Sequence, residues 1–421
     1  MSEMIQVPDG WEVKPLKEFI QFIKDGTHGT HQDVDIGVPL LSAKDIDNGK
    51  IDLNNEPRLI SQDDYNKIHK TYQIKINDIL LTIVGTIGRV AIVDINDIFT
   101  LQRSVAILRT NKFLTSKLAY HILSSNEFLQ KLLLMTNASA QGGIYLGSLS
   151  TLEIKVPKEK KEQEKIAKIL STLDKAIEST NRLIEKEKNI KIALMQELLT
   201  NGIDKNGQIR SPKTHTYKQS ELGLVPDEWE VVSLEKIGNV ITGNTPPTDN
   251  EDYYNGHIPF VGPVDLTGKK YISQTEKNVS KDGLNYSREI PKDSILTVCI
   301  GSTIGKIALT VKQCCTNQQI NALVCDKKYF SEFIFYAMSQ FLQRQLDIEA
   351  GLQAVPIVNK SSFAKLVLPC PLDLEEQKQI AKILTTQDKK IQTEETNLAK
   401  LKELKKGLMN DLLSGKVRVN V

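Results

Sequence analysis

The sequence lacks long apolar runs, paired cysteines and an excess of charge of either sign. No stretch approaches the roughly 18 consecutive apolar residues that a membrane-spanning helix requires, and the opening MSEMIQVPDG has neither the cationic nor the apolar region of a secretory signal. All five cysteines lie in the second half, without Cys-x-x-Cys spacing, which argues against a disulfide framework and a zinc site. These absences predict a cytoplasmic protein with no membrane partner.

Charge and composition are those of an ordinary globular protein. The chain has 54 Lys and Arg against 52 Asp and Glu, a formal net charge of +2. With 25% charged and 40% hydrophobic residues, it is not wholly disordered, and its 421 residues suffice for two or three domains. A balanced total neither favours nor excludes nucleic acid, because a basic surface can be local.

Catalytic motifs are also missing. The segment Gly301–Lys306 has three residues between its glycines where a phosphate-binding loop has four, and Ile307 stands where Ser or Thr would bind magnesium. A hairpin turn explains both glycines equally well. The segment 244–248, Asn-Thr-Pro-Pro-Thr, lacks the aromatic residue of an amino-methyltransferase motif. The sequence therefore predicts no catalytic site in this chain.

The clearest feature present is an internal repeat, which indicates two homologous units rather than a solenoid. The only two tryptophans, Trp11 and Trp229, are 218 residues apart, and this offset drifts to 214 between Ile166 and Ile380. The repeated segments are Val7–Val13 and Val225–Val231, Gly85–Arg89 and Ser302–Lys306, and Glu162–Leu170 and Glu376–Leu384.

Each unit begins with short predicted strands, broken by Gly, Pro, Asn and Asp, and ends with one long predicted helix. The clearest hairpin is Ile79–Val84, the turn 85–88 and Arg89–Val93, with a counterpart over Ile295–Leu309. The predicted boundaries are 1–156 and 218–371 for the strand-rich domains, 157–201 and 372–415 for the helices, 202–217 for a polar linker and 416–421 for a C-terminal tail.

The two helices carry an apolar stripe at the 3-4 spacing of a coiled coil. About 40 residues at 1.5 Å each make a rod of roughly 60 Å, whose stripe must be buried, and the other rod is the simplest partner. Glu187 and Lys191 interrupt the first stripe. The residues expected to pair the helices or bind partners are Ile166, Leu170, Leu173, Ile177, Ile184, Leu194 and Leu198, and Ile380, Leu384, Ile391, Leu398, Leu401, Leu408 and Leu412.

The expected fold class is therefore α+β: two homologous strand-rich domains in a pseudo-twofold internal repeat, separated by two long antiparallel coiled-coil helices. His28 and His31 lie near Asp33 and Asp35, but the matching segment of the second unit has no histidine, so we expect no metal site. Polar loop residues that differ between matched domains are typical of a surface that reads base edges. Solvated loop residues would have the same composition.

Cations and amides at matched places are the best candidates for DNA contacts. Arg89 and Lys306 follow the same turn, and a phosphate contact needs only a cation at a fixed place. Amide and guanidinium groups make bidentate contacts with bases. The DNA-binding candidates are Lys24, Thr27, His28, His31, Lys44, Arg89, Gln102 and Arg103 in the first unit, and Asn244, Thr245, Thr248, Lys269, Lys306, Asn317, Gln318 and Gln319 in the second.

Taken together, the repeated segments near Trp11 and Trp229 and the helix starts Glu-Gln-x-x-Ile-Ala-x-Ile-Leu resemble the specificity subunits of type I restriction-modification systems. The resemblance covers essentially the whole chain. It extends to Leu194–Leu199 and Leu408–Lys416, which look like the ends of that family's two spacer helices.

The resemblance implies a DNA-reading subunit without catalysis of its own. Each target-recognition domain would read one half of a bipartite, asymmetric double-stranded DNA target, and the paired helices would fix the gap between the halves. The helices would also dock two methyltransferase subunits, which restriction subunits with translocase and nuclease activity would join. S-adenosylmethionine, ATP and magnesium would belong to these partners.

Two alternatives remain open on the sequence. One is a catalytic subunit, a methyltransferase or a nuclease, which the missing motifs disfavour. The other is a coiled-coil adaptor that binds no DNA and uses two β-rich heads to hold proteins. These functions are distinguishable, because phosphate contacts make affinity for DNA fall steeply with salt.

Overall fold

The computed structural model describes residues 7–47, 49–137, 142–351 and 355–420. The chain forms two compact units: unit 1 contains 1–182 and 396–421, and unit 2 contains 183–395. Two helices of 41 residues, α5 (Lys160–Thr200) and α10 (Leu374–Ser414), contribute one part to each unit. None of the helices in the described ranges is long and apolar enough to span a bilayer.

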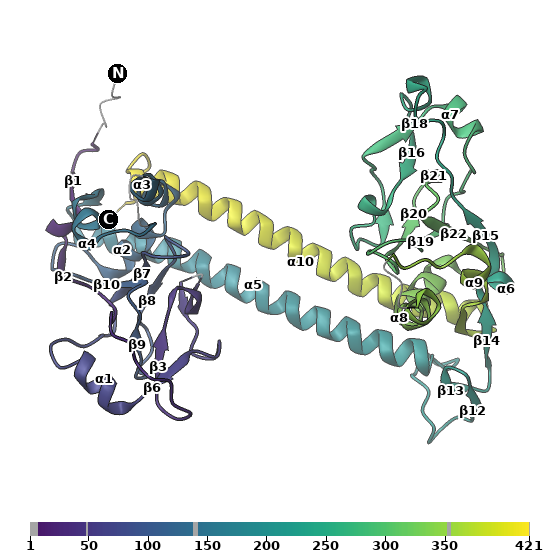
Figure 1. The fold of residues 1–421 in the computed structure, drawn as a ribbon, viewed down its shortest axis with the longest axis horizontal. Helices are drawn as coiled ribbons and strands as arrows, with labels where there is room; N and C mark the ends of the chain where they lie inside the picture. Colours follow the sequence, from purple (N-terminus) through teal and green to yellow (C-terminus); the bar gives the residue numbers. More distant parts are fainter. Residues whose placement is uncertain (1–6, 48, 138–141, 352–354, 421) are drawn as a thin grey trace. The chain divides into compact units, whose positions relative to one another are not determined.

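Unit 1 contains a four-stranded antiparallel sheet and a smaller mixed sheet (Figure 1). The large sheet has the order β2 (Ile20–Asp25), β10 (Val105–Thr110), β7 (Ile79–Thr82) and β8 (Val90–Ile92). The small one has the order β6 (Arg58–Ile60), β3 (Val38–Leu41) and β9 (Thr100–Leu101), with β3 and β9 parallel. The other strand pairs are β1 (Trp11–Pro15) with β11 (Glu153–Pro157), and β4 (Ile46–Asp47) with β5 (Lys50–Ile51). The helices are α1 (Gln62–Ile68), α2 (Ser116–Leu123), α3 (Asn126–Asn137) and α4 (Leu146–Thr151).

The large sheet of unit 1 is buried on both faces. Because side chains alternate along a strand, Ile79 and Leu81 of β7 face the core that contains α2 and α3, while Leu80 faces the small sheet. Leu41 of β3 and Leu101 of β9 complete this second core. The nearly continuous apolar sequence of β7 follows from this two-sided burial.

Unit 2 repeats the plan. Its large sheet has the order β15 (Gly238–Thr242), β22 (Ile320–Cys325), β19 (Ile295–Val298), β20 (Ile307–Thr310) and β17 (Tyr271–Ile272), and its small sheet β18 (Lys277–Val279), β16 (Ile258–Val261) and β21 (Cys315–Thr316). The pairs are β14 (Trp229–Ser233) with β23 (Val367–Pro371) and β12 (Tyr217–Ser220) with β13 (Gly223–Pro226). The helices are α6 (Leu234–Ile237), α7 (Lys281–Asn285), α8 (Ser331–Ala350) and α9 (Lys360–Lys365).

Matched strands have matched partners in the two units, so the predicted internal repeat and the α+β fold class are confirmed. The order β2-β10-β7-β8 corresponds to β15-β22-β19-β20, and β6-β3-β9 to β18-β16-β21. The predicted hairpin is β7 with β8, and its counterpart is β19 with β20. The glycine-containing segment 301–306 is the turn of the second hairpin, where Gly301 (φ 99°) and Gly305 (φ 89°) adopt backbone angles that favour glycine.

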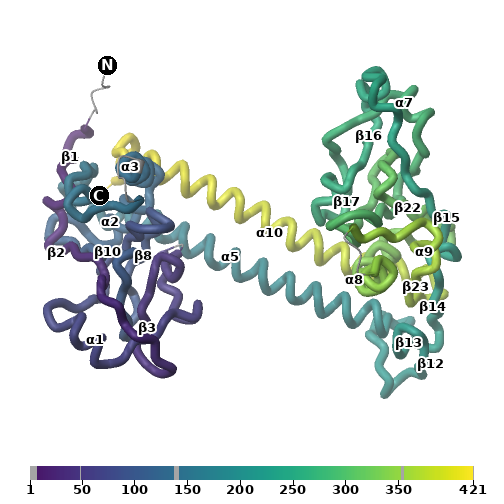
Figure 2. Tube along the Cα trace, in the orientation of Figure 1, coloured from purple at the N-terminus to yellow at the C-terminus, as the bar shows by residue number. Residues whose placement is uncertain are grey.

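Within each unit, α5 and α10 lie side by side and antiparallel, as predicted (Figure 2). In unit 2, Lys188 pairs with Glu395 (3.1 Å) and Lys191 with Asp388 (2.6 Å), so the α10 number falls as the α5 number rises. The interruption of the stripe at Glu187 also has a partner. Gln387 donates a hydrogen bond from Nε2 to Glu187 Oε2 (2.9 Å), so the buried carboxylate is satisfied within the helix pair.

The stripe residues divide into two groups. Those near the helix ends belong to the cores of the strand-rich domains: Ile166, Leu170 and Leu412 in unit 1, and Leu198, Ile380 and Leu384 in unit 2. Those between them are buried or half-buried along the helices: Leu173, Ile177, Ile184, Leu194, Ile391, Leu398, Leu401 and Leu408. The helices therefore pack on the domains through the same stripe that pairs them.

The start of α10 is fixed in unit 2 by a buried cluster around Glu376. Its Oε1 accepts hydrogen bonds from Trp229 Nε1 (3.1 Å) and the Ile203 N–H (3.0 Å). Arg210 binds both carboxylate oxygens, at 2.5 and 3.0 Å. The segment 202–217 was predicted to be a polar linker, but Ile203 and Arg210 are 2% and 7% exposed. The segment predicted as a linker therefore also supplies partners of Glu376.

Unit 1 contains the equivalent cluster at the start of α5. Trp11 Nε1 donates to Glu162 Oε1 (3.3 Å), and Arg418 binds the same carboxylate at 2.6 and 2.8 Å. The predicted tail 416–421 thus supplies, through Arg418, the arginine that the segment after α5 supplies in unit 2. The repeated Trp and Glu-Gln residues of the sequence are therefore structural contacts.

A buried histidine links α2 to α5 in unit 1 and makes its stability depend on pH. His121 Nε2 lies 3.0 Å from Ser171 Oγ, and burial lowers the pKa of His121 to about 4. An unfolded histidine takes up its proton near pH 6.5, whereas the folded one does so only near pH 4. The free energy of unfolding is therefore not reduced by this group above pH 6.5, and it falls by up to about 3 kcal/mol as the pH drops toward 4. We expect His121→Tyr to reduce this loss, because Tyr336, at the matched place in unit 2, donates to Asp388 (2.5 Å).

Urea unfolding at pH 7 and pH 5, followed by Trp11 fluorescence in a Trp229→Phe background, measures the effect. The control is His257→Tyr, at an exposed site in unit 2. Equal pH dependence in wild type and His121→Tyr would show that His121 is not the group responsible.

Candidate nucleic-acid interface

In unit 1, loops from both sheets meet at one edge of the domain. Thr27, after β2, forms a bridge with Gln102, before β10. The Gln102 N–H donates to Leu41 O at the end of β3 (2.8 Å), and the Ile83 N–H, after β7, donates to Ser104 O (2.8 Å). We call this the loop edge of unit 1, formed by residues 26–31, 42–45, 84–89 and 102–104.

Unit 2 has the same loop edge on its matched strands. The Gly243 N–H, after β15, donates to Ile320 O (3.1 Å), and the Asn317 N–H donates to Val261 O at the end of β16 (3.3 Å). Thr245 Oγ1 donates to Gln318 Oε1 (3.0 Å), which joins two of the loops. The loop edge of unit 2 is formed by residues 243–249, 262–265, 299–306 and 317–319.

A glycine at the first loop makes each loop edge possible. A Cβ on Gly26 would lie 2.1 Å from Leu101 O, and one on Gly243 would lie 2.0 Å from Thr316 Oγ1. No side chain fits so close to a neighbouring strand without moving it. The glycines at matched places in the two copies are thus explained by strand packing, and the residues that follow them are free to differ.

The first loop of unit 1 is held by its own polar side chains. Thr27 Oγ1 lies 2.8 Å from His31 Nε2, and His31 Nδ1 lies 3.6 Å from an Asp64 carboxylate oxygen on α1. His28 Nε2 lies 2.6 Å from Asp25 Oδ2, yet 64% of its side chain is exposed. His31 therefore positions the loop, while His28 faces solvent.

The cationic side chains predicted to contact DNA in unit 1 differ in exposure and in the partners they already bind. The Arg89 guanidinium donates to Ile46 O (3.3 Å) and lies 3.7 Å from Asp47, so it holds its own chain. Lys44 is exposed and donates to the carbonyl oxygens of Asn55 and Glu56, and Lys24 Nζ lies 4.4 Å from the centre of the Tyr72 ring. Gln102 is half-buried and Arg103 is exposed. Arg103 and His28 are the most open of these candidates.

In unit 2 the amides hold the loops, with several exposed side chains between them. Asn244 Nδ2 donates to Tyr286 O (2.5 Å), and Asn317 Nδ2 donates to Gln319 Oε1 (2.9 Å). The exposed candidates are Thr245, Thr248, Lys269, Lys306 and Gln318. Lys306 has no ion pair or side-chain hydrogen bond among the described residues, in contrast to Arg89 at the matched place.

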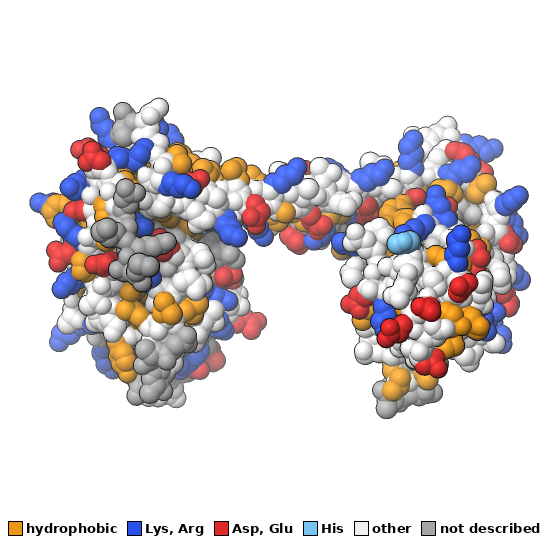
Figure 3. Space-filling view, turned by 90° about the horizontal axis from the view of Figure 1, so that it is seen from above, with side chains coloured by type: hydrophobic (Ala, Val, Ile, Leu, Met, Phe, Trp, Pro, Cys, Tyr) orange, Lys and Arg blue, Asp and Glu red, His pale blue; other side chains and the backbone are white. Residues whose placement is uncertain are grey.

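Charge is mixed on one face of the molecular surface. On the face that Figure 3 shows, Lys and Arg side chains alternate with Asp and Glu on both units. Over the described ranges, no group of three His, Cys, Asp or Glu side chains is placed to hold a metal ion. The loop edges therefore offer hydrogen-bonding groups and a few open cations rather than one large basic patch.

Comparison with protein families identifies what such a pair of domains does. A family model described as the type I restriction modification DNA specificity domain matches residues 8–188 and, a second time, residues 226–403. The chain belongs to this family. Its function is that of a specificity subunit of a type I restriction-modification system, which the match favours over a protein-binding adaptor.

Relatives of the specificity family match either nearly the whole chain or one part of it. The putative type I restriction enzyme MjaX specificity subunit of Methanocaldococcus jannaschii is 28% identical over 432 residues, covering 99% of this chain and 96% of the relative. The HindI specificity subunit of Haemophilus influenzae is 34% identical over 151 residues, covering 35% and 33%. The crystal structure of the S subunit from M. genitalium has a TM-score of 0.63 and 17% identity, covering 98% of each chain. The last match shows the shared fold.

Backbone hydrogen bonds join one more segment to each loop edge, which sequence reasoning missed. The Ile144 N–H donates to Ile83 O (2.9 Å) in unit 1, and the Val358 N–H donates to Cys299 O (2.8 Å) in unit 2. Beside these bonds, Tyr145 is 60% exposed and Ile357 is 45% exposed. Exposed apolar side chains at the loop edge suit contact with thymine methyl groups. The two segments share no sequence motif, so only the backbone pairing reveals them.

Proposed function

We propose that each unit reads one half of a bipartite, asymmetric double-stranded DNA target through its loop edge. The two helices fix the gap between the halves and dock two methyltransferase subunits, which restriction subunits join in the cytoplasm. The chain contributes recognition and no catalytic step, and S-adenosylmethionine, ATP and magnesium are bound by the partner subunits.

One observation carries the proposal: matched sheets present matched loops with different side chains. Exposed His28 and Arg103 of unit 1 contrast with exposed Thr245 and Gln318 of unit 2. Base pairs differ in where they place donors, acceptors and methyl groups in the major groove, so different side chains on one scaffold select different sequences. Half-sites of different sequence are therefore expected.

The helices retain apolar side chains for partners after pairing with each other. In unit 2, Ile192 is 64% exposed, and in unit 1, Leu404 is 51% exposed. Exposed apolar side chains on a helix pair that already buries one stripe support docking of another subunit. This surface is where we place the methyltransferase subunits.

The test is to express the chain with its methyltransferase subunit and to map modified adenines by single-molecule sequencing. We expect one bipartite motif with a fixed gap, which disappears when this chain is omitted. A well-assembled complex that modifies no bipartite motif would overturn the proposal.

A single substitution assigns one half-site to one unit. We expect Gln318→Ala to relax or weaken recognition at one base of the half-site read by unit 2, since a bidentate base contact contributes about 1–3 kcal/mol of discrimination. The control is Lys327→Ala, an exposed lysine that follows β22 at the opposite end of the sheet. A change in both half-sites would contradict independent reading by the two units.

A further inference from the structure

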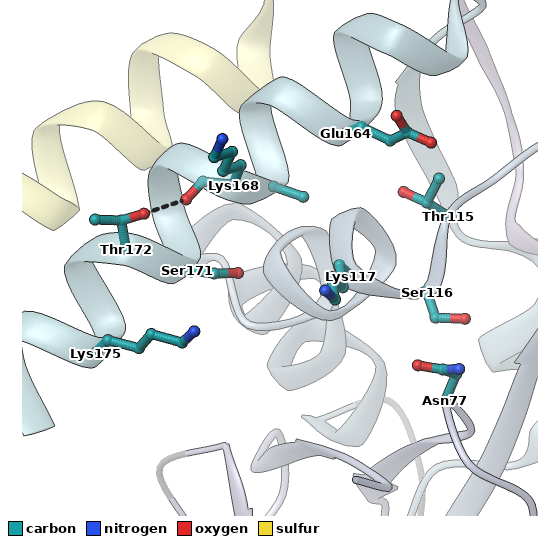
Figure 4. Close-up of a pocket in the computed structure, with 10 residues that line it drawn as sticks. Asn77, Thr115, Ser116, Lys117, Glu164, Lys168, Ser171, Thr172 and Lys175 are labelled. Atoms are coloured by element: carbon teal, nitrogen blue, oxygen red, sulfur yellow. Dashed lines mark hydrogen bonds between the residues drawn. The ribbon is translucent and has the colours of Figure 1, made fainter.

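Unit 1 contains a cavity that lies away from its loop edge. It has a volume of about 690 Å³ and is formed by α5, the start of α2 and Asn77, which precedes β7. The loop edge lies at the other end of β7, where Ile83 binds Ser104. In Figure 4, Lys117 of α2 and Lys175 of α5 point toward each other from the two sides of this cavity, with Ser171 between them.

The cavity carries an excess of positive charge. Lys117, Lys168 and Lys175 line it, and none of the three has an ion pair or a side-chain hydrogen bond within the described ranges. Among the described residues that line the cavity, Glu164 alone carries a carboxylate. Lys168 points away from the other two in Figure 4, so the ammonium groups of Lys117 and Lys175, against one carboxylate, are those that favour an anion.

Neutral groups in the cavity also suit an anion. Thr115 precedes α2, yet its hydroxyl makes no capping hydrogen bond to the helix. The uncapped first turn of α2 therefore presents N–H groups and the positive end of a helix dipole. Ser116 Oγ, 3.0 Å from Thr110 Oγ1, and Ser171 Oγ, 3.0 Å from His121 Nε2, add hydroxyl groups that can each make a further hydrogen bond. Lysines, hydroxyls and a helix N-terminus together are the usual partners of phosphate.

Unit 2 fills the matched place with its own side chain. Lys270 Nζ donates to Thr385 Oγ1 (2.7 Å) and to Glu332 Oε2 (2.9 Å), and the Lys270 side chain is 9% exposed. Thr385 matches Ser171 at the helix offset of 214, and Glu332 matches Lys117 at an offset of 215. Unit 2 thus holds a cation against an acid.

In unit 1, the charge at the position of Glu332 is reversed, and the side chain at the position of Lys270 is absent. Lys117 replaces the acid Glu332. Beside β8, where the matched chain of unit 2 supplies Lys270, unit 1 has Gly49, and the next residue, Lys50, forms an ion pair with Glu178 instead. Lys270 of unit 2 therefore has no counterpart in the cavity, and Lys117 stands there in the place of the acid Glu332.

We propose that this cavity binds a small phosphate-bearing anion of nucleotide size, with Lys117 and Lys175 on the phosphates. The volume lies within the roughly 300–1,000 Å³ of small-molecule sites, so it admits more than a bare phosphate. Glu164 accepts hydrogen bonds from hydroxyl or amino groups on the rest of the ligand. The site goes beyond the reading of DNA, because it lies at the opposite end of β7 from the loop edge.

The test measures binding of ATP and of pyrophosphate to the full chain by isothermal titration calorimetry. We expect the double variant Lys117→Glu and Lys175→Glu to lower ATP affinity by about tenfold or more, since two attractive charges become repulsive. The control is Lys382→Glu and Lys389→Glu, which reverses two exposed lysines on α10 that match Lys168 and Lys175 at the offset of 214, and it should leave affinity unchanged.

The results with ATP and pyrophosphate distinguish the possible ligands. Tighter binding of ATP than of pyrophosphate identifies a nucleoside phosphate, and equal binding identifies a polyphosphate; both support the site. Equal loss of affinity in both double variants, or no ATP binding by the wild type, overturns it. If only duplex DNA that carries the target motif displaces ATP, the anion that the cavity binds is a phosphate of the DNA backbone. That result would also overturn the proposal of a small-ligand site. Methylation of the bipartite motif is measured separately, so failure here leaves the proposed function standing.

Discussion

Replacing Glu376 with alanine is expected to destabilise unit 2 by about 3–5 kcal/mol, the usual cost of removing one partner from a buried ion pair. The carboxylate is 7% exposed and accepts hydrogen bonds from Trp229, Ile203 and Arg210. Without it, the Arg210 guanidinium, also 7% exposed, keeps among the described residues only the longer contact of its Nε with Oε2 of the exposed Glu228 (3.8 Å). The indole N–H of Trp229 loses its acceptor as well.

The matched substitution in unit 1 is a control with a smaller expected effect. Glu162 holds Trp11 and Arg418 in the same way, but the Arg418 side chain is 44% exposed, so water can hydrate its guanidinium after Glu162→Ala. We expect a loss of about 1–3 kcal/mol, that of an unsatisfied group with access to solvent.

Because Trp11 and Trp229 are the only tryptophans, fluorescence distinguishes the two units. Urea unfolding of Glu376→Ala is followed by Trp229 in a Trp11→Phe background, and that of Glu162→Ala by Trp11 in a Trp229→Phe background. Equal losses in the two units would show that burial of the arginine does not set the cost.

The architecture was largely predictable from the sequence because it rests on local patterns that occur twice. The short apolar run Ile79–Val84, the turn glycines and the helical stripe each specify an element without knowledge of its partner. The partners themselves were less accessible. Glu187 looked like an interruption of the stripe, and only the register of α5 against α10 shows that it meets Gln387.

The linker and the loop edges show where sequence reasoning ends. The segment 202–217 is polar, yet its Arg210 is buried because it binds Glu376. This partner lies 166 residues away in the sequence, so local patterns do not reveal the contact. Arg89 and Lys306 occupy the same place in the repeat, but Arg89 binds the carbonyl of Ile46 while Lys306 is exposed. Equivalent positions in a repeat therefore share a backbone and not a role, which is what two different half-sites require.

Shortening both helices by one heptad is expected to eliminate methylation of the original bipartite motif. Deletion of 176–182 from α5 and 397–403 from α10 removes matched segments of unit 1 and keeps Asp174 with Lys405 and the helix contacts of unit 2. Seven residues at 1.5 Å correspond to about 10 Å, or about three base-pair steps of 3.4 Å. If the helices set the gap, both half-sites keep their sequence and the gap between them becomes shorter.

Adenine mapping with the methyltransferase subunit reads out the gap directly. A same-length control, Lys402→Ala with Glu403→Ala, alters exposed positions within the deleted segment and should keep the original motif. Unchanged recognition by the shortened chain would contradict a ruler made of helices, because the same half-sites would then be reached across the same gap with a shorter separator. A new motif with both halves intact would instead establish that sequence and spacing are specified by separate parts of the chain, the loop edges and the helices.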